Sequence, residues 1–218
     1  MAQVFSQPAS QIIGLVLWGL LALILIVPIG WTTFDHSPWN TGQFAMPAQP
    51  VPFSHAHHVG ELGLSCQYCH QGVMTSASAG LPATEVCMTC HSQILKDAPV
   101  LAPIRASFRT GKPVVWQRVN KLPDYVYFNH AAHVNNGVGC VTCHGRVDDM
   151  PLMQQAAPLT MQWCLNCHRD PTPNLRPAEA EFSMDWQPAD DPRKLGVALL
   201  AHYHIHPETL TDCYVCHR

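Results

Sequence analysis

The fold is decided by the stretch FNHAAHVNNGVGCVTCH, which runs from Phe128 to His144. An earlier stretch, FSHAHHVGELGLSCQYCH, runs from Phe53 to His70 and has the same design. Each begins with Phe-x-His-x-x-His and ends with Cys-x-x-Cys-His, and a second Cys-x-x-Cys-His follows each, at residues 87–91 and 164–168. The copies start 75 residues apart (128 − 53), and repetition at a fixed interval indicates a duplicated module.

A fifth Cys-x-x-Cys-His lies at residues 213–217, so all ten cysteines of this 218-residue chain belong to such motifs. In this motif both thiols form thioethers with porphyrin vinyl groups, and the following histidine ligates the iron. The sequence therefore predicts five covalently attached haem c groups. The predicted attachment residues are Cys66, Cys69, Cys87, Cys90, Cys140, Cys143, Cys164, Cys167, Cys213 and Cys216. The predicted proximal ligands are His70, His91, His144, His168 and His217.

Zinc is the main alternative, because the spacing between the first and second motifs, and between the third and fourth, fits a four-cysteine zinc site. Histidine follows the second cysteine in all five motifs, which a zinc site does not require. Five pairs also cannot be divided into two-pair sites without one left over. Haem is therefore favoured over zinc and over redox disulfides.

Nine histidines lie outside the motifs, and the Phe-x-His-x-x-His pairs are the strongest candidates for distal iron ligands. Histidines at i and i+3 of a helical turn can reach two different irons. The predicted distal ligands are His55, His58, His130 and His133. One iron is left over, and its open candidates are Met150, Met161, His202, His204 and His206. His36 and His57 are interpreted as solvated or facing haem propionates.

The expected fold is a multihaem c-type cytochrome in which the haems form the hydrophobic core. Too few residues accompany each haem to build ordinary layers around it. We expect short α-helices at the motifs, mostly irregular chain between them, a short helix near residues 193–202, and one N-terminal transmembrane helix.

Residues 12–29 are almost wholly apolar and are long enough to approach the ~20 residues that span a bilayer. Residues 1–11 contain no lysine or arginine, which argues against a cleaved signal peptide. Trp31 follows the segment, where interfacial aromatic residues collect. Haem attachment takes place outside the cytoplasm, and the first basic residue is Lys96. We therefore expect a single-pass anchor in a bacterial cytoplasmic membrane, with the haem region in the periplasm.

The organisation follows from these features. The expected parts are an anchor (1–31), a linker without regular structure (32–52), a first dihaem module (53–96), a basic insert (97–127), a second dihaem module (128–170) and a C-terminal wrapping segment with the fifth haem (171–218). The insert holds Arg105, Arg109, Lys112, Arg118 and Lys121. Either it folds back over the first two haems and pairs with their propionates, or it is a solvated charged loop.

Composition bears on partners. Charged residues make up only 12% of the chain against ~25% in typical proteins, and the net charge is −3 with no basic stripe. No nucleic-acid partner is expected. A surface poor in charge suits burial against other subunits.

The chain resembles the pentahaem cytochrome c subunit of the bacterial alternative complex III. The resemblance is carried by PVVWQRVNKLPDYVYFNHAAH (113–133), GVGCVTCHG (137–145), MQWCLNCHR (161–169) and LTDCYVCHR (210–218). It implies an electron-transfer subunit of a menaquinol-oxidising membrane complex, not an enzyme by itself. Implied partners are an iron–sulfur, molybdopterin-enzyme-like subunit, a polytopic quinol-binding subunit, a monohaem cytochrome and a periplasmic electron acceptor. Many relatives lack the histidines before the fifth motif, which favours methionine as the remaining ligand.

The modules also resemble the small class III multihaem cytochromes. That resemblance implies that His55 serves the His70 haem and His130 the His144 haem. It implies that His58 and His133 serve other haems, and leaves open whether these belong to the other module.

Three other functions are weighed. An anchored quinol dehydrogenase feeding a periplasmic reductase shares the topology, but such proteins often carry methionine where this chain has Gly72. A catalytic reductase needs an open iron, often with lysine as proximal ligand, whereas all five motifs here end in histidine. A soluble shuttle does not fit the anchor.

Overall fold

The structure is a computed structural model that describes residues 6–189 and 191–217. Residues 1–5 of the expected anchor, and residues 190 and 218 of the expected C-terminal segment, lie outside the described residues. The chain forms two compact units, Met1–Gly42 and Gln43–Arg218.

The first unit is dominated by α1 (Gln7–Asp35), which is long and apolar enough to cross a membrane. At 1.5 Å per residue its 29 residues extend for about 44 Å, against about 30 Å of bilayer hydrocarbon. None of its described side chains is buried against other parts of the chain. Pro28 lies inside the helix and does not end it. An apolar N-terminal helix was predicted, and its presence is confirmed.

The prediction of an irregular linker over residues 32–52 is wrong for residues 32–35 and 38–41, which are helical. α1 continues through Trp31 to Asp35, and α2 (Pro38–Thr41) follows. The hydroxyl groups of Thr32 and Thr33 donate to carbonyls one turn back and stay compatible with a helix. Pro38 stands at the first helical position of α2, where its missing N–H costs nothing. Residues 42–52 contain no helix or strand.

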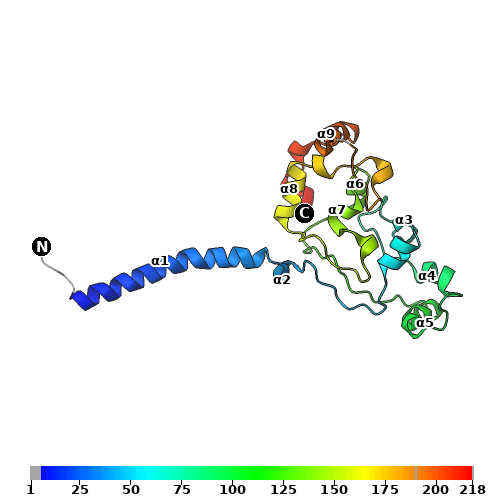
Figure 1. Cartoon of the computed structure of the whole chain (residues 1–218), viewed down its shortest axis with the longest axis horizontal. Coiled ribbons are helices and arrows are strands. Elements are labelled where there is room, and N and C mark those ends of the chain that lie inside the picture. The colour runs from blue at the N-terminus through cyan, green and yellow to red at the C-terminus, as the bar shows by residue number, and fades with distance from the viewer. Residues whose placement is uncertain (1–5, 190, 218) are drawn as a thin grey trace. The chain divides into compact units, whose positions relative to one another are not determined.

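The second unit consists of short helices joined by irregular chain (Figure 1). Its α-helices are α3 (Cys66–Cys69), α4 (Thr84–His91), α5 (Ala102–Thr110), α6 (His130–Val134), α7 (Cys140–His144), α8 (Met161–Arg169), α9 (Pro192–His202) and α10 (Cys213–Cys216). Its other helical turns are the π-helix η1 (Ala56–Glu61) and the 3₁₀ turns η2 (Pro99–Leu101), η3 (Val147–Asp149), η4 (Thr172–Asn174), η5 (Ala178–Ala180) and η6 (Pro207–Thr209). The described chain contains no strand, only two isolated bridges. α9 confirms the short helix expected near residues 193–202.

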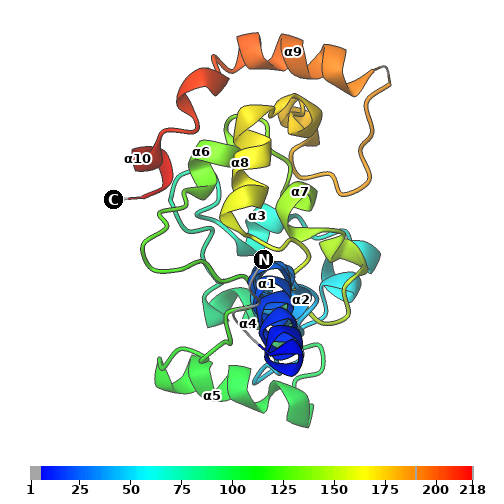
Figure 2. The same cartoon turned by 90° about the vertical axis from the view of Figure 1, so that its left-hand side faces the viewer.

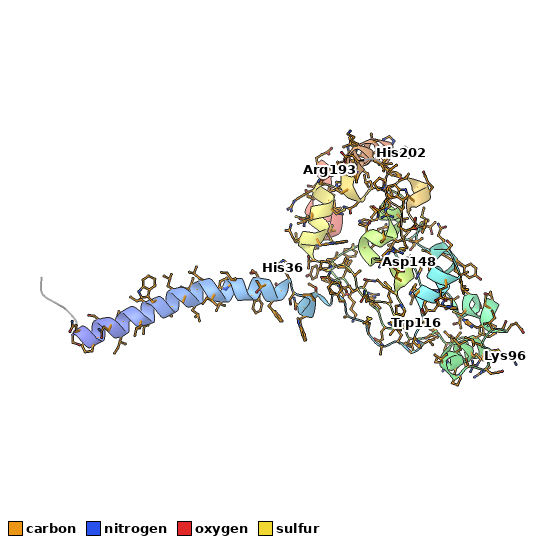
Figure 3. The ribbon with its side chains drawn as sticks, viewed as in Figure 1. His36, Lys96, Trp116, Asp148, Arg193 and His202 are labelled. Carbon is orange, nitrogen blue, oxygen red and sulfur yellow. The ribbon has the colours of Figure 1, made fainter. Side chains whose placement is uncertain are left out.

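The helices of this unit run from one end to the other in both views. α4 and α5 lie at one end, α9 lies at the opposite end, and α3, α6, α7, α8 and α10 lie between them (Figure 2). The side chains follow the same layout: Lys96 marks the first end, Asp148 the middle, and Arg193 with His202 the far end (Figure 3).

Protein side chains alone form only a small core. Val51, Leu101 and Ile104 are buried together and pack with parts of α4 and of residues 114–116. No large side chain among the described residues is completely buried. A unit of this size usually encloses several such side chains. The pattern agrees with a core that the polypeptide shares with prosthetic groups.

The basic insert is not simply a solvated loop. Residues 99–110 form η2 and α5, and α5 packs on α4, the helix of the second motif. A hydrogen bond of 2.7 Å joins Thr84 of α4 to the buried Ser107 of α5. Arg105 is half-buried and donates to the carbonyl of Ala98, while Arg109, Lys112 and Arg118 are exposed. The pairing of these cations with propionates stays a prediction.

Candidate haem-binding sites

Each Cys-x-x-Cys-His motif forms its own helical turn. The five turns lie in α3, α4, α7, α8 and α10. Ser65 caps α3 by accepting from the N–H of Gln67, and Thr160 caps α8 by accepting from Trp163. Cysteines three positions apart lie on one side of such a turn, and the histidine follows at its end. All ten cysteines are free of disulfides.

The sulfur atoms show how the motifs neighbour one another. Cys66 and Cys140 share a hydrogen bond that lowers the pKa of Cys66 to about 7 and raises that of Cys140. Cys69 lies near Cys87 and helps burial to raise the pKa of the Cys87 thiol. In the second half of the unit, Cys143 neighbours both thiols of the fourth motif, and Cys164 neighbours Cys216. The motifs therefore lie in the spatial order second, first, third, fourth, fifth.

Each module forms hydrogen bonds with the Phe-x-His-x-x-His segment of the other module. After the first motif, the carbonyl of Ala77 accepts hydrogen bonds from both the backbone N–H and Nδ1 of His130. After the third motif, the carbonyl of Met150 accepts from the N–H of Ala56, and Gly60 lies directly against the backbone of Asp148. The exchange is reciprocal, so the first and third motifs meet where the modules join.

Both Phe-x-His-x-x-His segments adopt one geometry. Phe128 stacks on His133, with centroids 4.4 Å apart, and meets His130 edge-on at 4.8 Å. Phe53 stacks on His58 at 4.3 Å and meets His55 edge-on at 4.9 Å. The phenylalanine thus holds two imidazoles in different planes. This explains why phenylalanine recurs in the motif.

Three of these imidazoles face motif histidines across a gap that fits a metal ion. The ring centroids are 6.4 Å apart for His130 and His144, 6.0 Å for His133 and His168, and 6.1 Å for His58 and His91. Imidazole nitrogens bind first-row metals at about 2 Å, and each nitrogen lies about 1.2 Å from its ring centre. Two imidazoles on opposite sides of one metal therefore have centres about 6.4 Å apart.

In most of these histidines Nδ1 is hydrogen-bonded to the backbone, which leaves Nε2 to bind a metal. In seven of the nine predicted ligands, Nδ1 lies 2.7–3.2 Å from a backbone carbonyl oxygen to which it can donate: His58, His70, His91, His130, His133, His168 and His217. Metal-binding histidines characteristically donate their second N–H in this way, which fixes the tautomer and orients Nε2. This pattern is the arrangement that haem ligation needs.

His144 and His55 differ from the other seven. Nδ1 of His144 lies 3.2 Å from the side-chain amide of Asn120, and Nδ1 of His55 is buried without a partner among the described residues. Burial, reinforced by neighbouring histidines, lowers the pKa of both rings to about 4. Both imidazoles are therefore neutral at ordinary pH, which is the state that ligates a metal. His55 lies near His70, and also near His58 and His144.

Other histidines are engaged elsewhere. His57 contacts Glu61 at 2.7 Å, His206 contacts Glu208 at 3.3 Å, and Nδ1 of His36 contacts the carbonyl of Thr32 at 2.8 Å. All three lie at exposed positions, as do His202 and His204. The ring recorded beside His217 among the described residues is Tyr125, at 5.8 Å. The remaining iron ligand is thus not identified by a facing imidazole.

The motif pairs do not assemble into a zinc site. Among residues 6–189 and 191–217, no three histidine, cysteine, aspartate or glutamate side chains are grouped so that they could hold a metal ion by themselves. The residues present instead fit haem, because a porphyrin supplies four of the six iron ligands and leaves two for facing imidazoles.

Comparison with known proteins shows that the chain is similar to c-type cytochromes. Residues 51–103 match the family described as "Cytochrome c7 and related cytochrome c". Over 125 residues the chain is 35% identical to the "Menaquinone reductase, multiheme cytochrome c subunit" of Nitratidesulfovibrio vulgaris. That similarity covers 57% of this chain, and the chain spans little more than half the length of the relative, 56%. The predicted fold class is confirmed: a multihaem c-type cytochrome of short helices and irregular chain with one N-terminal apolar helix.

Sequence reasoning missed several site residues. It did not find Asn120, nor the carbonyls of Gly80, Ile94 and Leu210 that accept from motif histidines. Backbone acceptors leave no trace in residue identity. One feature of the sequence could have pointed to Asn120. It lies eight residues before Phe128, within the stretch that carries the family resemblance.

Proposed function

We propose that the chain binds five haem c groups and is an electron-transfer subunit of a membrane complex that acts on menaquinol. The observation that carries the proposal is the ring geometry: three facing imidazole pairs at 6.0–6.4 Å, with Nδ1 of five of their six rings at a backbone carbonyl. When bound, haem supplies a one-electron iron centre at each motif.

The proposed ligand set follows the repeat. His58 serves with His91, His130 with His144, and His133 with His168. By the equivalence of the two modules, His55 serves with His70, which is among the groups nearest to it. In this assignment His58 and His133 serve the second motif of their own module, so neither crosses to the other module.

For the fifth site we propose Met161 rather than Met150. Met150 is only 7% exposed, and its methyl group lies beside Gly145, next to the third motif. Met161 is 64% exposed and stands one turn before Cys164, whose thiol neighbours Cys216 of the fifth motif. Replacing Met161 with leucine should lower the potential of one haem or make it high-spin, whereas the same change at Met150 should not. Thioether ligation raises the potential of a haem relative to bis-histidine ligation.

The order of the motifs suits a relay with two ends. The second motif lies at the α4–α5 end, where Cys90, Ile94 and Leu95 are exposed. The fifth lies in α10, between α9 and the α4–α5 end, where Cys213 and Tyr214 are exposed. Electrons would enter at one exposed end and leave at the other, while the first, third and fourth sites connect them.

The proposed setting is alternative complex III, in which α1 anchors the chain and the haem-bearing unit lies in the periplasm. Partners would include an iron–sulfur and molybdopterin-like subunit, a polytopic quinol-binding subunit and a monohaem cytochrome, with a periplasmic carrier as acceptor. The relative from Nitratidesulfovibrio vulgaris is named a menaquinone reductase subunit, which supports a menaquinone-linked role and offers the reverse direction as the second candidate.

Purification of the full chain from membranes in mild detergent tests this proposal. Copurifying subunits should be found, and a menaquinol analogue should reduce the haems of the complex but not those of the chain alone. If the isolated chain oxidises the quinol, the anchored quinol dehydrogenase is the better description. Reduction of a menaquinone analogue by a reduced periplasmic cytochrome, without the opposite reaction, would favour the reductase direction.

A further inference from the structure

We infer that Asn120 is a positioning residue for His144, and that it tunes the potential of the haem at the third motif. The inference rests on the proposed haem site at that motif. It adds to that site a residue that belongs to neither the Cys-x-x-Cys-His nor the Phe-x-His-x-x-His motif. Asn120 lies in the insert between the modules, 24 positions before His144, and its side chain reaches the motif histidine from outside both modules.

His144 is the exception among the five motif histidines. The other four motif histidines present Nδ1 to backbone carbonyls, those of Gly80, Ile94, Leu210 and Tyr125. His144 presents Nδ1 to a side chain instead, the amide of Asn120 at 3.2 Å. A side-chain acceptor can be changed by substitution, and a backbone carbonyl cannot.

This hydrogen bond has a defined direction. When Nε2 of His144 ligates iron, Nδ1 carries the proton and must donate. The atom recorded opposite it is Nδ2 of Asn120, also a donor, while Oδ1 of the same amide is buried without a partner. The two ends of an amide have the same shape, so turning it places Oδ1 on the Nδ1 proton. After this rotation Oδ1 accepts from Nδ1 of His144, and Nδ2 takes the buried position that Oδ1 held. The proton on Nδ1 therefore identifies Oδ1 as the acceptor for His144.

This hydrogen bond controls the orientation and the basicity of the His144 ring. The rings of His144 and His130 are nearly parallel, with an angle of 3° between their planes, whereas the angles are 29° for His133 with His168 and 62° for His58 with His91. A hydrogen bond at Nδ1 fixes the rotation of the ring about its bond to iron. The acceptor also sets how much electron density the imidazole donates, since a stronger acceptor makes the ligand more basic.

The test uses three variants of the full membrane-anchored chain, matured with haem. Asn120→Asp keeps the size of the side chain and supplies an anionic acceptor, so one haem should shift to lower potential. Asn120→Leu removes the acceptor, so one haem should shift to higher potential. Gln117→Glu is the matched control: it adds a negative charge three residues away at an exposed position, where only the backbone of Gln117 makes recorded hydrogen bonds.

Two readouts separate positioning from general damage. A redox titration followed by absorbance should show that about one-fifth of the absorbance change moves along the potential axis. It should move to lower potential in Asn120→Asp and to higher potential in Asn120→Leu. Low-temperature electron paramagnetic resonance should show a change in one low-spin signal, the same signal that disappears when His130 is replaced. Shifts in both Asn120 variants that match those of Gln117→Glu, or a change in a different haem signal, would overturn the inference.

Haem content distinguishes failure of the role of Asn120 from failure of the proposed haem site. Five haems per chain with no opposite shifts would reject the role of Asn120 and leave the proposed function intact. A wild-type chain without haem at the third motif would instead reject the proposed site itself. Because Asn120→Asp is nearly isosteric, it remains informative if Asn120→Leu does not mature.

Discussion

Replacement of His130 with alanine should leave every haem attached and convert one haem in five to the high-spin state. Attachment depends on the cysteines, which the change does not touch. The ring of His130 faces that of His144 at 6.4 Å and is the proposed distal ligand there. Without it, that iron has five ligands, while the other four sites keep their facing groups.

The structure also gives the cost to the polypeptide. His130 loses its Nδ1 hydrogen bond to Ala77 and its edge-on contact with Phe128, together about 2 kcal/mol. The backbone hydrogen bond from residue 130 to Ala77 remains, so that carbonyl keeps a partner. A loss of this size is small against a typical folding free energy of about 5–15 kcal/mol, so the fold should survive.

Absorbance and electron paramagnetic resonance of the purified variant measure the spin state, and added imidazole should restore the low-spin spectrum. His57→Ala is the control, because His57 is exposed and its ring contacts Glu61 and the edge of His58 without facing a motif histidine. An His130→Ala variant whose spectrum equals that of the wild type would refute the assignment. Conversion of two or more haems would refute the independence of the sites.

Three further perturbations test the packing around the sites. Ile104→Ala should lower the free energy of unfolding by about 2–5 kcal/mol in denaturant titration, because Ile104 is 4% exposed in a buried cluster that joins the insert to α4; an effect under about 0.5 kcal/mol would contradict this packing. Gly60→Ala should destabilise the haem-bearing unit by about 1–3 kcal/mol, since the added methyl group meets the backbone of Asp148 where the modules join; Gly63→Ala, which meets nothing but has a left-handed φ of 67°, should cost less. Arg146 donates two hydrogen bonds to Asp148 and holds the pKa of the Asp148 carboxyl below its usual 3.8. The stability that this pair contributes is therefore fully present above pH 3.8 and is lost as the pH falls through the lowered pKa of Asp148. Asp148→Asn should therefore flatten the acid side of the stability profile, and an unchanged profile would show that the pair is not coupled to folding.

The features that could be predicted from the sequence are those that depend on the type of residue at each position. The motifs specify the helical turns of α3, α4, α7, α8 and α10, because haem attachment needs both thiols and the histidine in one local arrangement. The duplicated Phe-x-His-x-x-His segments predict paired imidazoles, and the structure gives both copies the same ring geometry. The apolar run of residues 12–29 predicts a long helix in the same manner.

The features that could not be predicted depend on backbone atoms and on contacts distant in sequence. The order of the motifs arises from tertiary contacts such as that between Cys66 and Cys140. The hold of Ala77 on His130 is made by a carbonyl, which any residue would supply. The end of α1 was predicted too early, because loss of hydrophobicity at Thr32 and Thr33 marks the end of an apolar segment and not the end of a helix.

The central claim is that each of the five motifs holds one haem by two thioether bonds. The most direct test combines the pyridine haemochrome assay with intact mass measurement on the purified full-length chain. The account predicts five haems of the c type per polypeptide and a mass increased by five haem groups. A count well below five, or zinc in place of iron in metal analysis, would contradict it.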